Sequence, residues 1–365
     1  MRSLPRLPLR LAVPTLLRRD DEPAAPAATM RRTQERPIFR PHAERRGEQV
    51  RKIEDKDEHK DRLKAGLQTK RRPPEGGTTN QDRKGALVID VHTHIGKIRH
   101  GEPWLTAGKL VRWMDRQGID QALVMAIENP EELHYYVPTP YILKSCQRFP
   151  DRLIPCCNVD PRIDNSSPET DFHSILKDYV DEGAMAFGEC LAGMAIDDPR
   201  LVALFQACGR LSLTVTLHID NLRQQDQLGL PGLRRLLKAC SDTVFFAHAP
   251  HWWAEISADV RVEDRGGYPS RPVVPGGAVE GIFKEHSNIY GDISAGSGYN
   301  ALTRDPEFGR GFLERWQDRL CFGTDYLAPG QECPIVQYIR EVDISEKARR
   351  KIVRGNALRL LGLKP

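Results

Sequence analysis

The fold is decided by the stretch Ala86-Leu87-Val88-Ile89-Asp90-Val91-His92-Thr93-His94, an apolar and β-branched run that ends in two histidines one residue apart. Side chains alternate between the two faces of a strand, so His92 and His94 are expected to point the same way, about 7 Å apart along the chain. Two imidazoles on one face at the carboxyl end of a strand can bind one metal ion. An isolated H-x-H pair more often combines a buried structural histidine with a loop histidine, so the rest of the chain must decide.

Strand and helix patterns alternate from residue 85 onward. Further strands are predicted at 122–127, 153–159, 184–189, 213–218, 243–248, 288–293 and 320–325. Helices are predicted at 106–117, 139–148, 171–181, 201–210, 233–239, 279–284, 306–316 and 345–361, with a Gly- and Pro-rich loop at 249–277. Eight such units in about 280 residues match the size of an α/β fold of the TIM-type (β/α)₈ barrel class. An open doubly wound sheet would place a Gly-rich nucleotide-binding turn after the first strand, where this chain has the two histidines.

The first 84 residues differ in composition from the rest. They carry 22 Lys and Arg against 13 Asp and Glu, whereas residues 85–365 carry 32 against 37. Arg and Pro interrupt every apolar run in 1–84, so we expect a disordered basic N-terminal extension. A transit peptide, a nucleic-acid-binding arm and a start at Met30 remain open, and a dispensable tail is favoured. The predicted domains are therefore this extension, 1–84, and a barrel at 85–365.

Eight cysteines are spread along the chain without a C-x-x-C pair. Most lie within apolar runs, as in Leu153-Ile154-Pro155-Cys156-Cys157. This pattern is typical of reduced, buried thiols in a cytoplasmic protein, and it argues against a zinc site made of cysteines. No run of 18 or more apolar residues occurs, so no membrane-spanning helix is expected.

Polar residues recur where the predicted strands end. In a barrel, active sites form at the carboxyl ends of the strands. These ends carry His92 and His94, Glu189, His218 and Asp220, His248, Asp292 and Asp325. Each residue alone is readily explained as structural. His and carboxylate groups at the same level of at least five strands, however, predict a common site.

Together these residues resemble the amidohydrolase superfamily. The resemblance spans about residues 86–363 and rests on Asp90-Val91-His92-Thr93-His94, His218, His248, Phe322-Gly323-Thr324-Asp325 and Gly355-Asn356-Ala357-Leu358-Arg359-Leu360-Leu361-Gly362. It is closest to the amidohydrolase-2 group, which contains the aminocarboxymuconate-semialdehyde decarboxylase-like enzymes. It therefore implies a metal-dependent enzyme built on a (β/α)₈ barrel.

The resemblance also implies roles for single residues. The ligands of a divalent metal would be His92, His94, His218 and Asp325. His248 would be a catalytic acid/base or a ligand to a second ion. Glu189 departs from the group, because a Gly-Glu pair on strand four is similar to metal-dependent deoxyribonucleases of the same superfamily, in which the glutamate bridges two metals. We expect one ion, with two left open, and count Glu189 among the candidate metal ligands.

The expected ligand types set the chemistry. Imidazoles with one carboxylate suit Zn²⁺, the metal we expect, and also Mn²⁺, Fe²⁺ or Ni²⁺. A bound metal lowers the pKa of its water toward 7 and so supplies a nucleophile at neutral pH. Asp325 is expected to accept the proton of this water, and His248 to protonate the leaving group. Asp90, placed on the same strand face as the two histidines, either orients one imidazole or is a helix-facing or water-bridged residue.

Two loops are expected to contact the substrate. His251-Trp252-Trp253-Ala254-Glu255 follows His248 closely, and its two tryptophans either form a wall of the pocket or pack the loop onto the barrel. The segment from Ser294 to Asn300 is small and polar, which suits a close approach of backbone to ligand.

The leading hypothesis is a metal-dependent hydrolase that cleaves an amide, lactone or ester of a small organic molecule. The alternative is a metal-dependent non-oxidative decarboxylase of an aromatic or dienoic acid, which would use the same ligands. The presence of both His248 and Asp325 argues against an inactive metal-binding scaffold. A nuclease is disfavoured because the net acidic barrel opposes binding of a phosphate backbone. The expected partner is a small-molecule substrate, with homo-oligomerisation left open.

Overall fold

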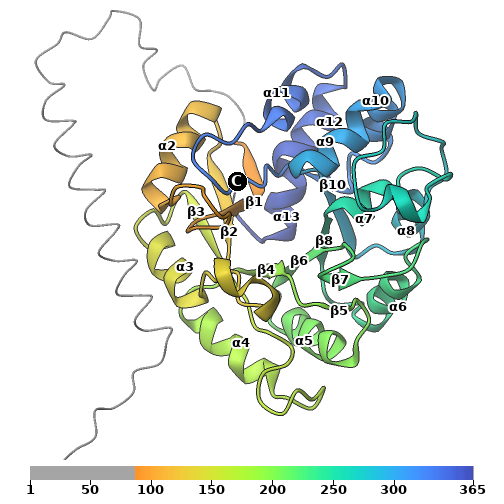
Figure 1. The fold of residues 1–365 in the computed structure, drawn as a ribbon. Coiled ribbons are helices and arrows are strands. Elements are labelled where there is room, and N and C mark those ends of the chain that lie inside the picture. The colour runs from red at the N-terminus through yellow and green to blue at the C-terminus, as the bar shows by residue number, and fades with distance from the viewer. Residues whose placement is uncertain (1–86, 365) are drawn as a thin grey trace, which may run out of the picture. The chain divides into compact units, whose positions relative to one another are not determined.

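Residues 87–364 form a (β/α)₈ barrel. The structure is a computed structural model that describes these residues, and the predicted extension 1–84 lies outside them. Helices surround a central ring of parallel strands (Figure 1). The strands are β1 (Ile89–His94), β2 (Gln121–Met125), β3 (Leu153–Cys157), β4 (Ala186–Cys190), β6 (Thr214–His218), β8 (Phe245–His248), β9 (Ile289–Asp292) and β10 (Leu320–Cys321). The predicted TIM-barrel fold is confirmed.

The barrel closes between its first and last strands. Neighbours in the sheet follow the chain order β1-β2-β3-β4-β6-β8-β9-β10. The main-chain N–H of Val91 donates to the carbonyl of Phe322 at 2.9 Å, and that of His94 donates to Tyr326 at 3.0 Å. These bonds bring the segment after β10 against the histidine-bearing strand.

Most helices lie where the apolar periodicity predicts them. They are α2 (Ala107–Gln117), α3 (Thr139–Cys146), α4 (Phe172–Asp181), α5 (Pro199–Arg210), α6 (Pro231–Ala239), α8 (Ala278–Glu285), α10 (Pro306–Arg315) and the C-terminal run α12 (Glu346–Arg350), η3 (Lys351–Gly355) and α13 (Asn356–Leu360). In α2, the Thr106 side chain accepts from the N–H of Lys109, and Gly118 ends the helix with a left-handed φ of 57°. Both residues are local signals that the sequence displays.

Several short elements differ from the prediction. The predicted loop after β8 contains α7 (Pro250–Ala254) and the turn η2 (Val262–Asp264), and the small, polar segment after β9 folds as α9 (Ala295–Thr303). Also unpredicted are η1 (Pro130–Tyr135), α11 (Pro334–Glu341) and a small sheet of β5 (Met194–Ala195) with β7 (Gln224–Gln225). Gly298 of α9 lies against the main chain of Ile293, where a Cβ atom would collide. Tertiary packing thus overrides the low helix propensity of this segment.

Two apolar clusters hold the barrel together. One lies between the strands and the surrounding helices, and the other combines inward strand residues such as Ile89 and Val91 with Ala357 and Leu361 of the C-terminal helical run. Within the described range, no helix is both long enough and apolar enough to cross a membrane.

Candidate metal centre

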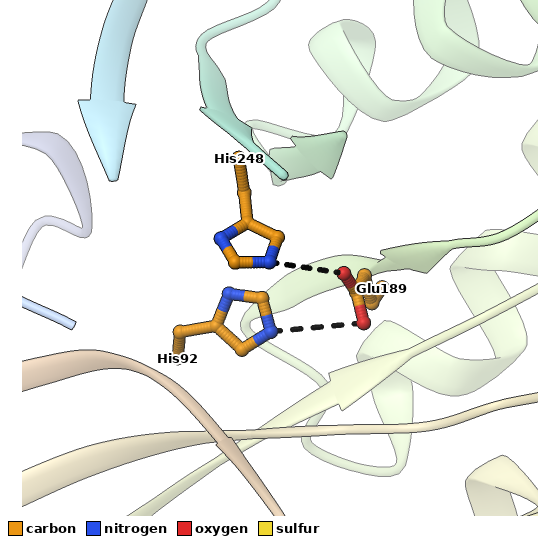
Figure 2. Close-up of side chains that lie close together, drawn as sticks. All are labelled: His92, Glu189 and His248. Atoms are coloured by element: carbon orange, nitrogen blue, oxygen red, sulfur yellow. Dashed lines mark ion pairs between the residues drawn. The ribbon is translucent and has the colours of Figure 1, made fainter. Parts of the chain in front are cut away.

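The predicted site residues meet at the carboxyl end of the barrel. His92 and His94 end β1, Glu189 lies on β4, His248 ends β8, and Asp325 follows β10. Figure 2 shows the side chains of His92, Glu189 and His248 pointing toward one another from three strands. All of these side chains except that of Asp325 are almost fully buried.

Three donor atoms, from His92, His94 and Asp325, lie at the separations that a single ion requires, and Glu189 lies beside the two imidazoles. The Nε2 atoms of His92 and His94 are 3.2 Å apart. Oε2 of Glu189 lies 3.6 Å and 3.4 Å from these two nitrogens, and Oδ1 of Asp325 lies 3.6 Å and 3.5 Å from them. Ligand atoms placed tetrahedrally at about 2.1 Å from one ion lie about 3.4 Å apart. His92, His94 and Asp325 therefore fit a divalent metal, and Glu189 is a further candidate ligand.

Asp292 fixes the orientation of His92. Its Oδ2 atom lies 2.6 Å from Nδ1 of His92, and both side chains are fully buried. This carboxylate accepts the proton of Nδ1, which leaves Nε2 free to face the other donor atoms. Burial lowers the pKa of His92, but the carboxylates of Glu189 and Asp292 outweigh it and raise the pKa well above its ordinary value. The pattern of polar residues at strand ends predicted that Asp292 lies at the carboxyl end of the barrel. It did not indicate that His92 is its hydrogen-bond partner.

His218, which the resemblance predicts to be a metal ligand, contacts two carboxylates in the structure. Its Nδ1 atom lies 2.6 Å from Oε1 of Glu189, and its Nε2 atom lies 3.2 Å from Oδ2 of Asp220. Burial lowers the pKa of His218, but these two carboxylates raise it to about 9. The imidazole thus donates from both nitrogens and holds Glu189. Burial would raise the pKa of Glu189, whereas the charges of His218 and His92 lower it well below its usual value.

His248 stands beside the cluster as a neutral imidazole. Its Nδ1 atom is 2.8 Å from Oγ of Ser294, whose own hydroxyl donates to Asp292 at 2.9 Å. Ser294 must therefore accept from Nδ1–H of His248, which leaves Nε2 as an open acceptor 4.0 Å from Oε1 of Glu189. Burial and the positive charge of His92 lower the pKa of His248 to about 4.

Asp90 contacts neither imidazole ring. Its carboxylate accepts from the N–H of His92 and from the N–H and hydroxyl of Thr324. The pairing register of β1 with β2 shifts between Asp90 and Thr93, so strict alternation fails there and Asp90 does not share the face of the two histidines. Asp90 instead fixes the segment that precedes Asp325. Burial is the main cause that raises the pKa of Asp90 to about 7.

A cavity of about 300 Å³ opens onto the cluster, at the lower end of the range for small-molecule sites. His94, Glu189 and Asp325 line its floor, and Arg99 and His100 from the loop after β1 also line it. The two tryptophans after His248 do not contribute, because Trp252 and Trp253 are fully buried and pack among aromatic rings such as Phe283 and Phe312. Of the two interpretations, packing of the loop onto the barrel is the one observed.

Comparison with known protein families identifies the family of this chain. The sequence profile of the amidohydrolase family, in its amidohydrolase-2 branch, matches residues 89–363. The chain belongs to the amidohydrolase family. No curated protein sequence is significantly similar to this amidohydrolase.

Solved structures share the fold at low sequence identity. A TIM-barrel protein of unknown function from Bordetella bronchiseptica is 16% identical, with a TM-score of 0.55 over 75% of this chain and 98% of that one. A probable 2-pyrone-4,6-dicarboxylic acid hydrolase from Acinetobacter baumannii is 14% identical, with a TM-score of 0.50 over 76% and 99%. A 5-carboxyvanillate decarboxylase from Novosphingobium aromaticivorans, complexed with manganese, is 15% identical, with a TM-score of 0.50 over 78% and 100%. At these identities the likeness concerns the fold alone.

Proposed function

We propose that the chain is a metal-dependent hydrolase that cleaves an amide, lactone or ester of a small organic substrate. The observation that carries this proposal is the convergence of His92, His94 and Asp325 at mutual separations of 3.2–3.6 Å, with Glu189 beside the two imidazoles. Three nitrogen or oxygen ligands with an open position are typical of catalytic rather than structural sites. The cavity of about 300 Å³ limits the substrate to a small molecule.

One ion is favoured over two. Nδ1 of His218 donates a hydrogen bond to Oε1 of Glu189 at 2.6 Å. Two ligands of the same ion at right angles lie about 3.0 Å apart, so this pair would have to separate before it could hold a second ion with His248. Zinc is the proposed metal, with manganese, iron and nickel as alternatives.

The chain's own residues would divide the catalytic work as follows. A bound divalent ion would supply Lewis acidity, polarising the scissile carbonyl and making water a nucleophile near pH 7. The carboxylate of Asp325 would accept the proton that this water loses. Nε2 of His248, an open acceptor, would take up that proton and pass it to the leaving group, and Ser294 holds the imidazole ring in position for that transfer. Asp292 keeps Nε2 of His92 directed into the site.

The test combines metal analysis with two assays. Wild-type protein should contain about one zinc per chain and hydrolyse a member of a panel of lactones, amides and esters. His94→Asn should lose both metal and activity. The matched control His286→Asn should retain both, because His286 lies at the end of α8, just before β9 begins at the opposite end of the barrel. Release of CO₂ from aromatic or dienoic acids, without any hydrolysis, would replace the hydrolase by a decarboxylase, and absence of metal would refute the proposal.

A further inference from the structure

Tyr268 is an exposed aromatic residue whose position is not explained by core packing. Its side chain is 58% exposed, and no described residue accepts a hydrogen bond from its hydroxyl. It lies near the tip of the segment 264–271, which is closed at its base by an ion pair. Arg271 donates to both carboxylate oxygens of Asp264, at 2.9 Å and 2.7 Å. The base of this segment is therefore fixed while its tip projects.

The tip rests on the start of α9. Asn300 of that helix donates to the carbonyl of Pro269 at 3.1 Å. A Cβ atom built on Gly296 would lie 2.7 Å from the hydroxyl oxygen of Tyr268 and 2.9 Å from two of its ring carbons. The phenol thus occupies the space that any larger residue at position 296 would fill. Glycine at this position makes room for the tyrosine.

The start of α9 adjoins the metal centre. The N–H of Ala295 faces the carbonyl of Thr324 at 3.4 Å, and Thr324 immediately precedes Asp325. The electrostatic surroundings of the phenol agree with this placement. Burial and the negative charge of Asp325 raise the pKa of Tyr268, and Arg99, which lines the cavity, partly offsets them. The hydroxyl accordingly stays protonated and remains a hydrogen-bond donor at neutral pH.

We propose that Tyr268 caps the mouth of the metal centre and donates a hydrogen bond to an oxygen of the bound substrate. This inference rests on the proposed metal-dependent function. The phenol selects small molecules that carry an acceptor oxygen on the end turned away from the metal. Gly266 and Gly267 precede Tyr268, and Cβ atoms built on either would meet nothing within 4 Å, so the tip can move aside as substrate enters.

The test uses Tyr268→Phe, Tyr268→Ala and Gly296→Ala in the full chain. Alanine at 296 pushes the phenol off its position, yet it should not unfold the protein, because Gly296 is exposed and the group displaced is the end of an exposed side chain. Gly311→Ala is the matched control, since it also replaces a helical glycine and its Cβ would meet open space. Melting temperatures should show all four variants folded.

Two readouts separate the cap from the metal site itself. The first is the rate at which dipicolinate removes zinc from the loaded protein, which should rise several-fold in Tyr268→Ala and Gly296→Ala and stay unchanged in Gly311→Ala. The second is kinetic: Tyr268→Phe keeps the ring but loses the donor, so KM should rise by about 3- to 10-fold with little change in kcat if the bond is equally strong in substrate and transition state. Tyr268→Phe should extract zinc at nearly the wild-type rate.

Each outcome supports or overturns the inference. Zinc extraction that is equal in wild type, Tyr268→Ala and Gly296→Ala, from proteins that all bind zinc, overturns the cap and leaves the proposed function intact. An unchanged KM in Tyr268→Phe overturns the hydrogen bond to substrate. Wild-type protein that binds neither zinc nor manganese, iron or nickel overturns the proposed function, and the cap with it.

Discussion

Replacing Asp292 with asparagine should weaken metal binding while the barrel stays folded. Asparagine has the same shape as aspartate but no charge. In the wild type, Oδ2 of Asp292 accepts from Nδ1 of His92 at 2.6 Å and from the hydroxyl of Ser294 at 2.9 Å, and Oδ1 accepts from the N–H of Ser294 at 3.0 Å. One amide oxygen cannot replace all of these acceptors. The His92 ring should therefore lose the fixed orientation in which Nε2 faces the ion.

The size of the effect follows from the geometry. Loss of a partner that orients a histidine ligand typically costs about 10- to 100-fold in metal affinity, which corresponds to about 1.4–2.7 kcal/mol. A hydrogen bond to a charged acceptor is roughly twice as strong as a neutral one, and asparagine can still offer a neutral oxygen. We therefore expect a loss nearer tenfold for Asp292→Asn and nearer a hundredfold for Asp292→Ala.

The assay is a competition for zinc between the protein and a chromophoric chelator at pH 7.5. Asp318→Asn is the matched control, because Asp318 is largely exposed and pairs with Lys351 at 2.6 Å, on the surface. Its zinc affinity should equal that of the wild type. If Asp292→Asn binds zinc as tightly as the control does, then Asp292 does not orient a ligand and the assigned role of His92 fails.

Four further predictions concern the site and its support. His248→Asn should keep its metal but lose turnover by about 100-fold or more, measured by metal analysis and steady-state kinetics. Glu189→Gln should lower metal content below one ion per chain, whereas a wild-type content of two that falls to one would show that Glu189 bridges a pair of ions. Gly323→Ala should destabilise the fold by about 1–3 kcal/mol in urea denaturation and weaken zinc binding, because the added methyl group collides with the carboxylate of Asp292. Deletion of residues 1–84 should leave melting temperature and activity unchanged, since β1 begins at Ile89 and completes the sheet; aggregation of the shortened chain would contradict this.

The barrel and the level of the site could be predicted from sequence because both depend on local patterns. Each buried strand is a short apolar run, and its last residues stand at the carboxyl end whatever its neighbours are. His92, His94, Glu189 and Asp325 were therefore expected in one place, and the structure brings them together. Helix α9 was missed because its glycines are required by close packing, Gly298 against Ile293 and Gly296 against Tyr268, which the composition of the segment does not reveal.

Sequence reasoning fell short where a conclusion depended on contacts between distant segments. Asp90 was placed by strict strand alternation, and a register shift of one strand against another breaks that alternation. His218 was assigned as a metal ligand by resemblance, and that assignment stays a prediction; only the fold shows that its two nitrogens lie beside Glu189 and Asp220. Tyr268 lies in a segment whose composition predicts only a loop, so its approach to α9 has no signal in the sequence.

The pairing of Asp292 with His92 shows how closure of the barrel creates the site. The two residues are 200 positions apart and stand on β9 and β1, with β10 between them. Two strands that are separated by one other strand lie about 9.6 Å apart. Their side chains can come within 2.6 Å of each other only if no side chain of the intervening strand fills the space between them. Gly323, which follows β10, leaves that space empty, because a Cβ atom there would collide with the Asp292 carboxylate and would lie 3.1 Å from Cβ of His92. The glycine of Phe322-Gly323-Thr324-Asp325 thus lets Asp292 reach the metal ligand on β1, just as the aspartate two residues later supplies a ligand of its own.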